Sequence, residues 1–136
     1  MSMFPTLDIS ATGMHAQTVR LNTIASNMAN VDSISSNSDE TYRSKQPVFK
    51  TIMDNETGRP AGGVMVDDIV ESKAPLKMEY NPNHPMANAE GYIYRPNVNV
   101  VEEMANMMSA SRSYETNIEV LNTSKQLLLR TIQMGK

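Results

Sequence analysis

The residues that could carry out acid–base or metal chemistry are few in this sequence and are poorly spaced for it. Asp67 and Asp68 are adjacent, and neighbouring side chains do not share a face of a strand or a helix, so we do not expect a catalytic pair of carboxylates. The two histidines, His15 and His84, come without any cysteine and without the H-x-x-x-H spacing of a helical metal site. His84 lies in the sequence NPNHP, which is typical of a turn.

Nucleophilic catalysis and phosphate binding also lack a sequence signal. No serine or threonine belongs to a recognisable cluster with a histidine and an acid. The glycines at 62 and 63 follow an alanine in a turn-like stretch and do not form a phosphate-binding loop. The sequence therefore predicts no enzyme, no metal site and no cofactor.

Composition favours a small protein with an adaptable apolar surface. The chain has 136 residues, which is the size of one domain, and it holds twelve Met, two Phe and no Trp. Methionine is flexible and suits irregular or repeated helix contacts. The formal net charge of −3 argues against general nucleic-acid binding.

The start of the chain does not resemble a cleavable secretion signal. The first basic residue is Arg20, and no apolar run follows a basic start. No stretch approaches the roughly 20 apolar residues that span a bilayer. We expect a chain that does not span a membrane and is either cytoplasmic or exported by a route other than Sec.

Glycine and proline divide the chain into three regions, because six of the seven prolines lie between Pro47 and Pro96. We expect an N-terminal helix in residues 1–31, starting near Leu7 and ending near Asn30. We expect a loop and a small β-rich region in residues 32–96, with short strands at 47–53, 62–71, 76–80 and 91–98. We expect a long C-terminal helix in residues 97–136, capped by Asn99 with Glu102 three positions later.

Both predicted helices carry apolar residues at heptad spacing. This pattern indicates that they pair with each other as a coiled-coil-like antiparallel hairpin. The residues that we expect in this intrachain seam are Leu7, Met14, Leu21, Ile24 and Met28 in the first helix and Met104, Met108, Tyr114, Ile118, Leu121, Leu128 and Ile132 in the second. The predicted fold is thus mainly α with a small β region.

Three asparagines, Asn22, Asn27 and Asn30, fall on the arc of the first helix opposite its apolar seam. From residue 9 to residue 31 the only charged side chain is that of Arg20, so this arc is polar without being charged. Amides that can both donate and accept suit packing against another chain. We expect these asparagines to contact neighbouring subunits; the alternative is a mildly polar surface helix.

Several segments together resemble the bacterial flagellar basal-body rod proteins. The stretch LNTIASNMAN at 21–30 resembles the N-terminal signature that several flagellar axial proteins share. The stretches YRSKQPVF at 42–49, GGVMVDDIVES at 62–72, NPNHPMANAEGYIYRPNVNVVEEM at 81–104 and SASRSYETNIEVLNTSKQLLL at 109–129 are similar to the short proximal-rod member of that family. The resemblance covers nearly the whole chain.

The resemblance implies a structural subunit and not an enzyme. It implies that the chain polymerises with copies of itself and other rod proteins into a hollow, torque-transmitting shaft of the basal body in the periplasm. It also implies export by the flagellar type III apparatus, contacts with neighbouring motor and basal-body base proteins, and no cofactor. Three alternatives remain: another axial role, as a distal-rod or hook-like subunit; a soluble coiled-coil adaptor; and an enzyme whose site the sequence does not reveal.

Overall fold

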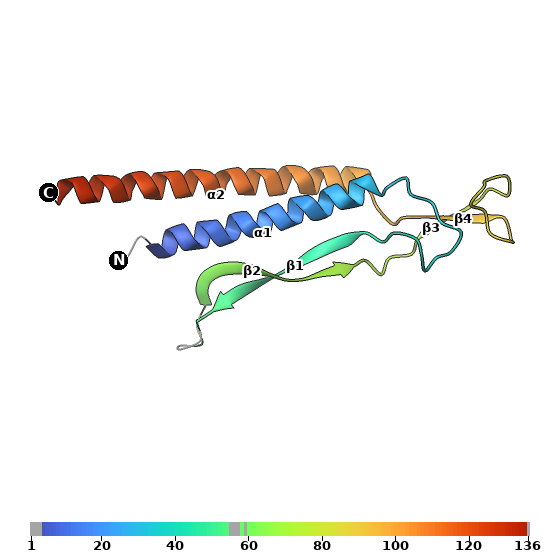
Figure 1. Ribbon diagram of the computed structural model, residues 1–136, viewed down its shortest axis with the longest axis horizontal. Helices are drawn as coiled ribbons and strands as arrows, with labels where there is room; N and C mark the ends of the chain where they lie inside the picture. The colour runs from blue at the N-terminus through green and yellow to red at the C-terminus, as the bar shows by residue number, and fades with distance from the viewer. Residues whose placement is uncertain (1–3, 55–57, 59, 136) are drawn as a thin grey trace.

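The computed structural model describes residues 4–54, 58 and 60–135 and shows a long molecule with two helices and two small β-hairpins. In chain order the elements are α1 (Phe4–Ala29), β1 (Lys45–Met53), β2 (Pro60–Glu71), β3 (Lys77–Tyr80), β4 (Tyr92–Arg95) and α2 (Val100–Met134). Helix α1 starts at the end of the molecule where both chain termini lie, and α2 returns the chain to that end (Figure 1). The β3–β4 hairpin forms the opposite tip.

The helix boundaries follow from local sequence. Pro5 lies in the first turn of α1, where its missing N–H leaves no hydrogen bond unmade, so the helix starts three residues earlier than expected. At the start of α2, the side chain of Asn99 accepts a hydrogen bond from the backbone N–H of Val101 at 3.2 Å. This is the N-cap that the sequence predicts.

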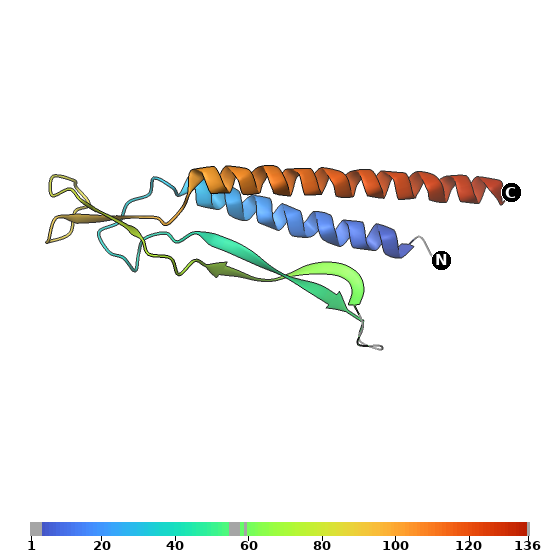
Figure 2. The same ribbon diagram turned by 180° about the vertical axis from the view of Figure 1, so that it is seen from behind.

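The two helices lie side by side and run in opposite directions, as both views across the molecule show (Figure 1, Figure 2). Asn27 near the end of α1 bonds to Glu103 near the start of α2. A Cβ added at Gly13 would lie 3.0 Å from the amide nitrogen of Asn117, so the helix backbones approach closely there. Gly13 has no Cβ, and small residues at such a crossing let the two helix backbones approach each other closely.

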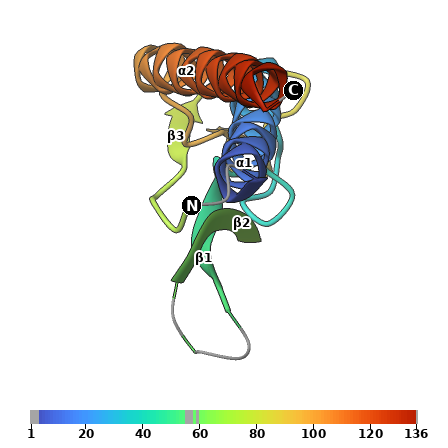
Figure 3. The ribbon, with the colours of Figure 1, turned by 90° about the vertical axis from the view of Figure 1, so that its left-hand side faces the viewer.

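The β1–β2 hairpin covers a second side of α1, so that α1 lies between α2 and the hairpin (Figure 3). The two strands pair antiparallel, with register shifts between Val48 and Phe49 and between Thr51 and Met53. The side-chain hydroxyl of Thr12 in α1 accepts a hydrogen bond from the backbone N–H of Val64 in β2 at 3.3 Å. The second hairpin pairs β3 with β4 antiparallel, and β4 is shorter than expected because Pro96 follows it.

The apolar core is thin, as the scarcity of aromatic residues suggests. The buried apolar residues among those described include Ala16, Ile24, Ile93, Pro96, Val98 and Ala110. Several other buried positions hold small or polar side chains, including Ser10, Thr23 and Ser124. The helices are therefore held together partly by polar contacts, and large apolar side chains remain on the surface.

Candidate assembly surface and the Asn27 junction

The side chain of Asn27, which is only 1 % exposed, makes hydrogen bonds to several separate segments of the chain. Its Nδ2 donates to the backbone oxygen of Lys45 at 2.9 Å and to Oε1 of Glu103 at 3.0 Å, and it lies 3.4 Å from Oγ of Ser44. Its Oδ1 accepts from the backbone N–H of Lys45 at 2.9 Å and from the hydroxyl of Tyr42 at 2.8 Å. One amide thus joins α1, the segment before β1, β1 itself and α2; we call this cluster the Asn27 junction.

Glu103 is the acidic member of the Asn27 junction and is 6 % exposed. Burial raises the pKa of its carboxyl, and the negative charge of Glu102 beside it acts in the same direction. The hydrogen bonds from Asn27 and Ser44 oppose this by lowering the pKa, but the net shift is upward. The junction is therefore a place where a carboxyl group is held in a poorly solvated position by neutral donors.

The position of Asn27 corrects the prediction that it contacts a neighbouring subunit. The chain after α1 folds back over the end of the helix, and the first turn of α2 meets it there, so the polar amide is satisfied within its own chain. Asn30 is half-buried and donates to the backbone oxygen of Ser26 at 2.8 Å. Asn22 is exposed, beside a groove of about 340 Å³ that Ile69 also lines. For Asn22 and Asn30, a role between subunits stays a prediction.

The predicted seam residues fall into two groups. In α1, Ile24 is buried and Leu7, Met14, Leu21 and Met28 are half-buried; in α2, Tyr114, Leu121 and Leu128 are half-buried. Four predicted seam residues of α2 are instead exposed: Met104 (51 %), Met108 (69 %), Ile118 (37 %) and Ile132 (55 %). Placing these four in the intrachain seam is wrong.

The reason is that α2 carries two stripes with the same alternating spacing of three and four residues. The column that faces α1 holds Glu103, Met107, Ala110, Tyr114, Asn117, Leu121, Ser124 and Leu128, and its small members let the helices approach. A neighbouring column, which we call the lateral stripe, holds Val101, Met104, Met108, Ser111, Glu115, Ile118, Asn122, Lys125, Leu129 and Ile132. A prediction based on apolar residues alone places the lateral stripe against α1. In the structure, the less apolar column that contains Ala110 and Ser124 lies against α1.

The lateral stripe is largely uncovered. All its members except the half-buried Ser111 are exposed. On the far side of α2 a third column, the polar stripe, is exposed too, but it lacks large apolar side chains: Glu102, Ala105, Ser109, Arg112, Thr116, Glu119, Thr123, Gln126, Arg130 and Gln133. Six of the nine exposed large apolar residues of α2 belong to the lateral stripe, and the other three are Val120, Leu127 and Met134. A surface that gathers so many exposed apolar side chains is typical of an interaction site.

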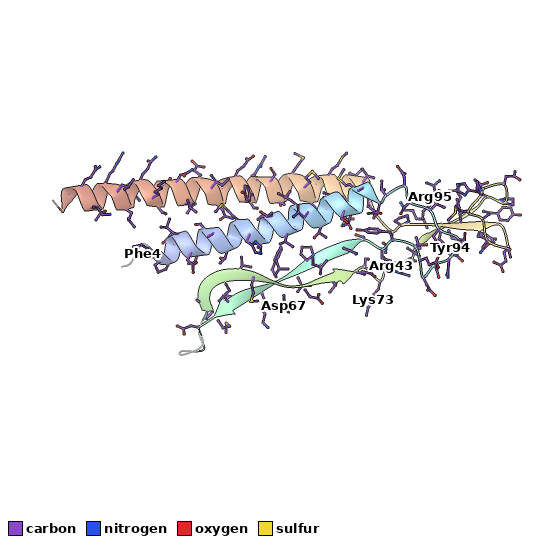
Figure 4. The ribbon with its side chains drawn as sticks, in the orientation of Figure 1. Phe4, Arg43, Asp67, Lys73, Tyr94 and Arg95 are labelled. Carbon is purple, nitrogen blue, oxygen red and sulfur yellow. The ribbon has the colours of Figure 1, made fainter. Side chains whose placement is uncertain are left out.

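The C-terminal end of α2 extends beyond the start of α1, where Phe4 lies (Figure 4). Leu121 and Lys125 of α2 line a hollow with Phe4 and Leu7 of α1, so the residues of α2 after this hollow form an overhang. Its apolar members include Leu127, Leu129, Ile132 and Met134, all exposed, with Met134 at 81 %. At about 100° per residue these apolar side chains cover more than one side of the helix, whereas Gln126, Arg130 and Gln133 keep a third side polar.

The residues with chemical potential have ordinary structural roles. Asp67 forms an exposed ion pair with Lys50 at 3.8 Å, and a carboxylate oxygen of Asp68 accepts from the N–H of Ile69 at 2.7 Å. Nδ1 of His84 accepts from the backbone N–H of Met86 at 3.1 Å, as in a turn. Within residues 4–54, 58 and 60–135, no cluster of histidine, aspartate or glutamate has the arrangement of a metal site.

No helix in the described part of the chain is both long enough and apolar enough to cross a membrane.

These features define a structural protein: a long helix pair with a buried polar junction and apolar helix surface that its own chain leaves uncovered. The family description "Flagella basal body rod protein" matches residues 7–33, and "Flagellar basal body rod FlgEFG protein C-terminal" matches residues 89–134.

Full-length relatives carry the same family name. The chain is 48 % identical over 136 residues to the flagellar basal-body rod protein FlgC of Salmonella typhimurium, and 47 % identical over 136 residues to FlgC of Escherichia coli O157:H7. It is 33 % identical over 150 residues to FlgC of Bacillus subtilis. Each alignment covers 100 % of both chains. The chain therefore belongs to the flagellar basal-body rod protein family.

Proposed function

We propose that the chain is a structural subunit of the proximal rod of the bacterial flagellar basal body. It assembles with copies of itself and with other rod proteins into a hollow shaft that transmits torque. The observation that carries this function is the identity of 48 % to a basal-body rod protein over the whole of both chains. A shaft requires no reaction site, so the chain acts by binding its neighbours and not as an enzyme.

The uncovered apolar surface of α2 supports assembly independently of the family. Burying apolar side chains stabilises by about 25 cal/mol per Å² removed from water, and the overhang and lateral stripe hold most of the exposed large apolar residues of α2. A contact that joins different patches on successive copies does not close on itself and produces a filament. A polymeric rod is an arrangement that covers such a surface on every copy.

We assign structural roles to three regions of the chain. Residues 1–31 and 97–136 form the axial core, in which α1 and α2 pair as a coiled-coil-like hairpin. Residues 32–96 form the loop and hairpin region, which lies farther from the axis of the rod. Uncharged Asn22 and Asn30 contact neighbouring subunits, where neutral amides avoid the desolvation cost of buried charges.

The proposed route and location follow from the same function. The chain is exported by the flagellar type III apparatus without a cleavable Sec signal and assembles in the periplasm. There it contacts neighbouring motor and basal-body base proteins as well as other rod subunits. These partners are proteins, in keeping with the net charge of −3.

Deletion of the gene in its own bacterium tests the function. We expect non-motile cells whose purified basal bodies lack a completed rod by electron microscopy. Swimming and rods should both return when the unchanged gene is supplied on a plasmid. Motile cells with complete rods would contradict a rod function, and a folded adaptor that stays in the cytoplasm would then be the reading to test.

A further inference from the structure

We propose that the lateral stripe of α2 binds the lateral stripe of a second copy of this chain, with the two α2 helices parallel and displaced by ten to eleven residues. This inference rests on the proposed rod function and specifies one contact within the rod. It concerns a surface that the chain's own α1 and hairpins leave exposed. The occupant is identified by the match between the stripe and its own displaced copy.

The first part of this match is the pairing of like polarity. The residues of the lateral stripe alternate between two positions of the heptad, and stripe residues ten or eleven apart occupy different ones of these two positions. A displacement of one and a half heptads therefore places the lateral stripe of one copy against the lateral stripe of the next. In this register apolar side chains meet apolar ones, and a hydroxyl meets an amide, at the pairs Met108–Ile118, Ile118–Leu129 and Ser111–Asn122.

The second part of the match is charge. Glu115 and Lys125 are the only charged residues of the lateral stripe, they are ten residues apart, and both are exposed. Within the described part of the chain neither belongs to an ion pair. In the displaced register Glu115 of one copy faces Lys125 of the next, which gives electrostatic complementarity at the centre of the contact.

Other registers match less well. Two parallel helices without displacement would place Glu115 against Glu115 and Lys125 against Lys125, and like charges facing each other at a contact are strongly unfavourable. An antiparallel pair can also bring Glu115 to Lys125, but it then places Ile118 against Asn122 and Ser111 against Leu129. The displaced parallel register brings Glu115 to Lys125 and also pairs Ile118 with Leu129 and Ser111 with Asn122.

The displaced register also has the geometry of a polymer. A displacement of ten to eleven residues corresponds to about 16 Å along the helix at 1.5 Å per residue. Residues 101–122 of the stripe on one copy face residues 111–132 on the next copy, and because different segments meet, the contact does not close on itself. At the ends of the overlap, the register leaves the less matched pairs Val101–Ser111, Met104–Glu115 and Asn122–Ile132.

Engineered cysteines test the register directly, because the chain contains no cysteine of its own. The variant that carries both Met108→Cys and Ile118→Cys is expressed in the deletion strain, and basal bodies are purified, oxidised and separated without reductant. Ten residues along one helix span about 15 Å, far beyond the reach of a disulfide, so a bridge can form only between copies. We expect a ladder of linked chains that includes species larger than a dimer.

The matched control carries Ser109→Cys and Glu119→Cys, which have the same spacing on the polar stripe and should give no ladder. If the first variant builds no rods, Ser111→Cys with Asn122→Cys replaces it. Complete rods without a ladder from both lateral pairs would overturn the inference and leave the rod function intact. A dimer formed by Met108→Cys alone would indicate the undisplaced register, and a product linked to another protein would indicate a different occupant; either result overturns the inference. Absence of rods with the unchanged chain would instead refute the proposed function.

Discussion

The amide Nδ2 of Asn27 donates a hydrogen bond to Oε1 of Glu103 at 3.0 Å, and this bond joins two helices across 76 positions of the sequence. The same amide binds both backbone groups of Lys45, so the end of α1, the start of β1 and the start of α2 share one anchoring side chain. In a molecule with so thin an apolar core, such a junction fixes how the hairpin sits against the helix pair.

We predict that Asn27→Ala destabilises the folded chain strongly. The substitution leaves the N–H and carbonyl of Lys45 and the carboxyl of Glu103 without their partner in a buried place. Unsatisfied buried groups cost about 1–3 kcal/mol each, so we expect the free energy of unfolding to fall by roughly 2–4 kcal/mol. Urea unfolding followed by circular dichroism measures this change.

Asn22→Ala is the control for this prediction, because Asn22 is an exposed asparagine of the same helix. We expect it to change the free energy of unfolding by less than about 0.5 kcal/mol. Equal effects of the two substitutions would show that the junction does not stabilise the chain.

We predict that Glu103→Gln reduces the dependence of stability on pH. Burial raises the pKa of Glu103 above 4.5, so the folded chain binds this proton more tightly than the unfolded chain does. The resulting stabilisation is fully present below the unfolded pKa and is lost as pH rises through the raised folded pKa. Glutamine stays neutral at every pH, so the variant should be more stable than the unchanged chain at pH 7 and should lose less stability between pH 4.5 and pH 7.

Denaturant midpoints measured at several pH values between 4.5 and 7 test this difference. Glu102→Gln, which removes the exposed neighbouring charge, should keep most of the pH dependence. If Glu103→Gln and the unchanged chain lose stability in parallel over this interval, Glu103 does not titrate in the way that its burial indicates.

Local sequence signals predicted the elements of this fold well. The cap at Asn99, the absence of glycine and proline between Pro96 and Gly135, and the turn residues that separate the short strands are local features, and the helices and strands occur near the expected positions. Such signals depend only on residues that are close in the sequence and not on the tertiary partner of the segment, so they can be recognised in a single sequence.

The partners of each surface could not be predicted in the same way. Met104 and Met108 form the better apolar stripe, yet Ala110 and Ser124 face α1, because close approach of two helices selects small residues. Asparagine is a residue type that is usually found at the surface. Asn27 is buried because the chain returns over it at residues 42–45. Residues 42–45 are mostly polar and lie close to the buried Glu103 in the folded chain. This proximity cannot be read from the sequence, because the two segments are far apart in it.

We predict that Gly62→Ala weakens the contact between β2 and α1. Gly62 has a φ of 87°, which an alanine adopts only with strain, and an added Cβ would lie 2.8 Å from Cδ1 of Ile9. Backbone strain causes most of the loss, because the far end of the exposed Ile9 side chain can move away from the added Cβ, so we expect the free energy of unfolding to fall by about 1–2 kcal/mol. Thermal unfolding followed by circular dichroism measures this loss.

Gly58→Ala separates the two causes. Gly58 also has a positive φ, of 61°, but nothing lies within 4 Å of an added Cβ. We expect it to cost only the backbone strain of about 1 kcal/mol. Equal losses at the two glycines would mean that the contact with Ile9 adds nothing.

We predict that exchanging the charges of the lateral stripe restores an assembly that either single reversal weakens. Lys125→Glu would place Glu115 of one copy against a glutamate of the next, and Glu115→Lys would place two lysines together. Like charges facing each other at a contact cost several kcal/mol, so each single variant should swim poorly in soft agar and yield few complete rods. The double variant keeps opposite charges in contact and should recover most of the swimming.

Glu119→Lys changes the charge by the same amount on the polar stripe and should swim like the unchanged strain. A double variant as impaired as the two singles would mean that Glu115 and Lys125 of successive copies do not meet, and the displaced register would have to be abandoned.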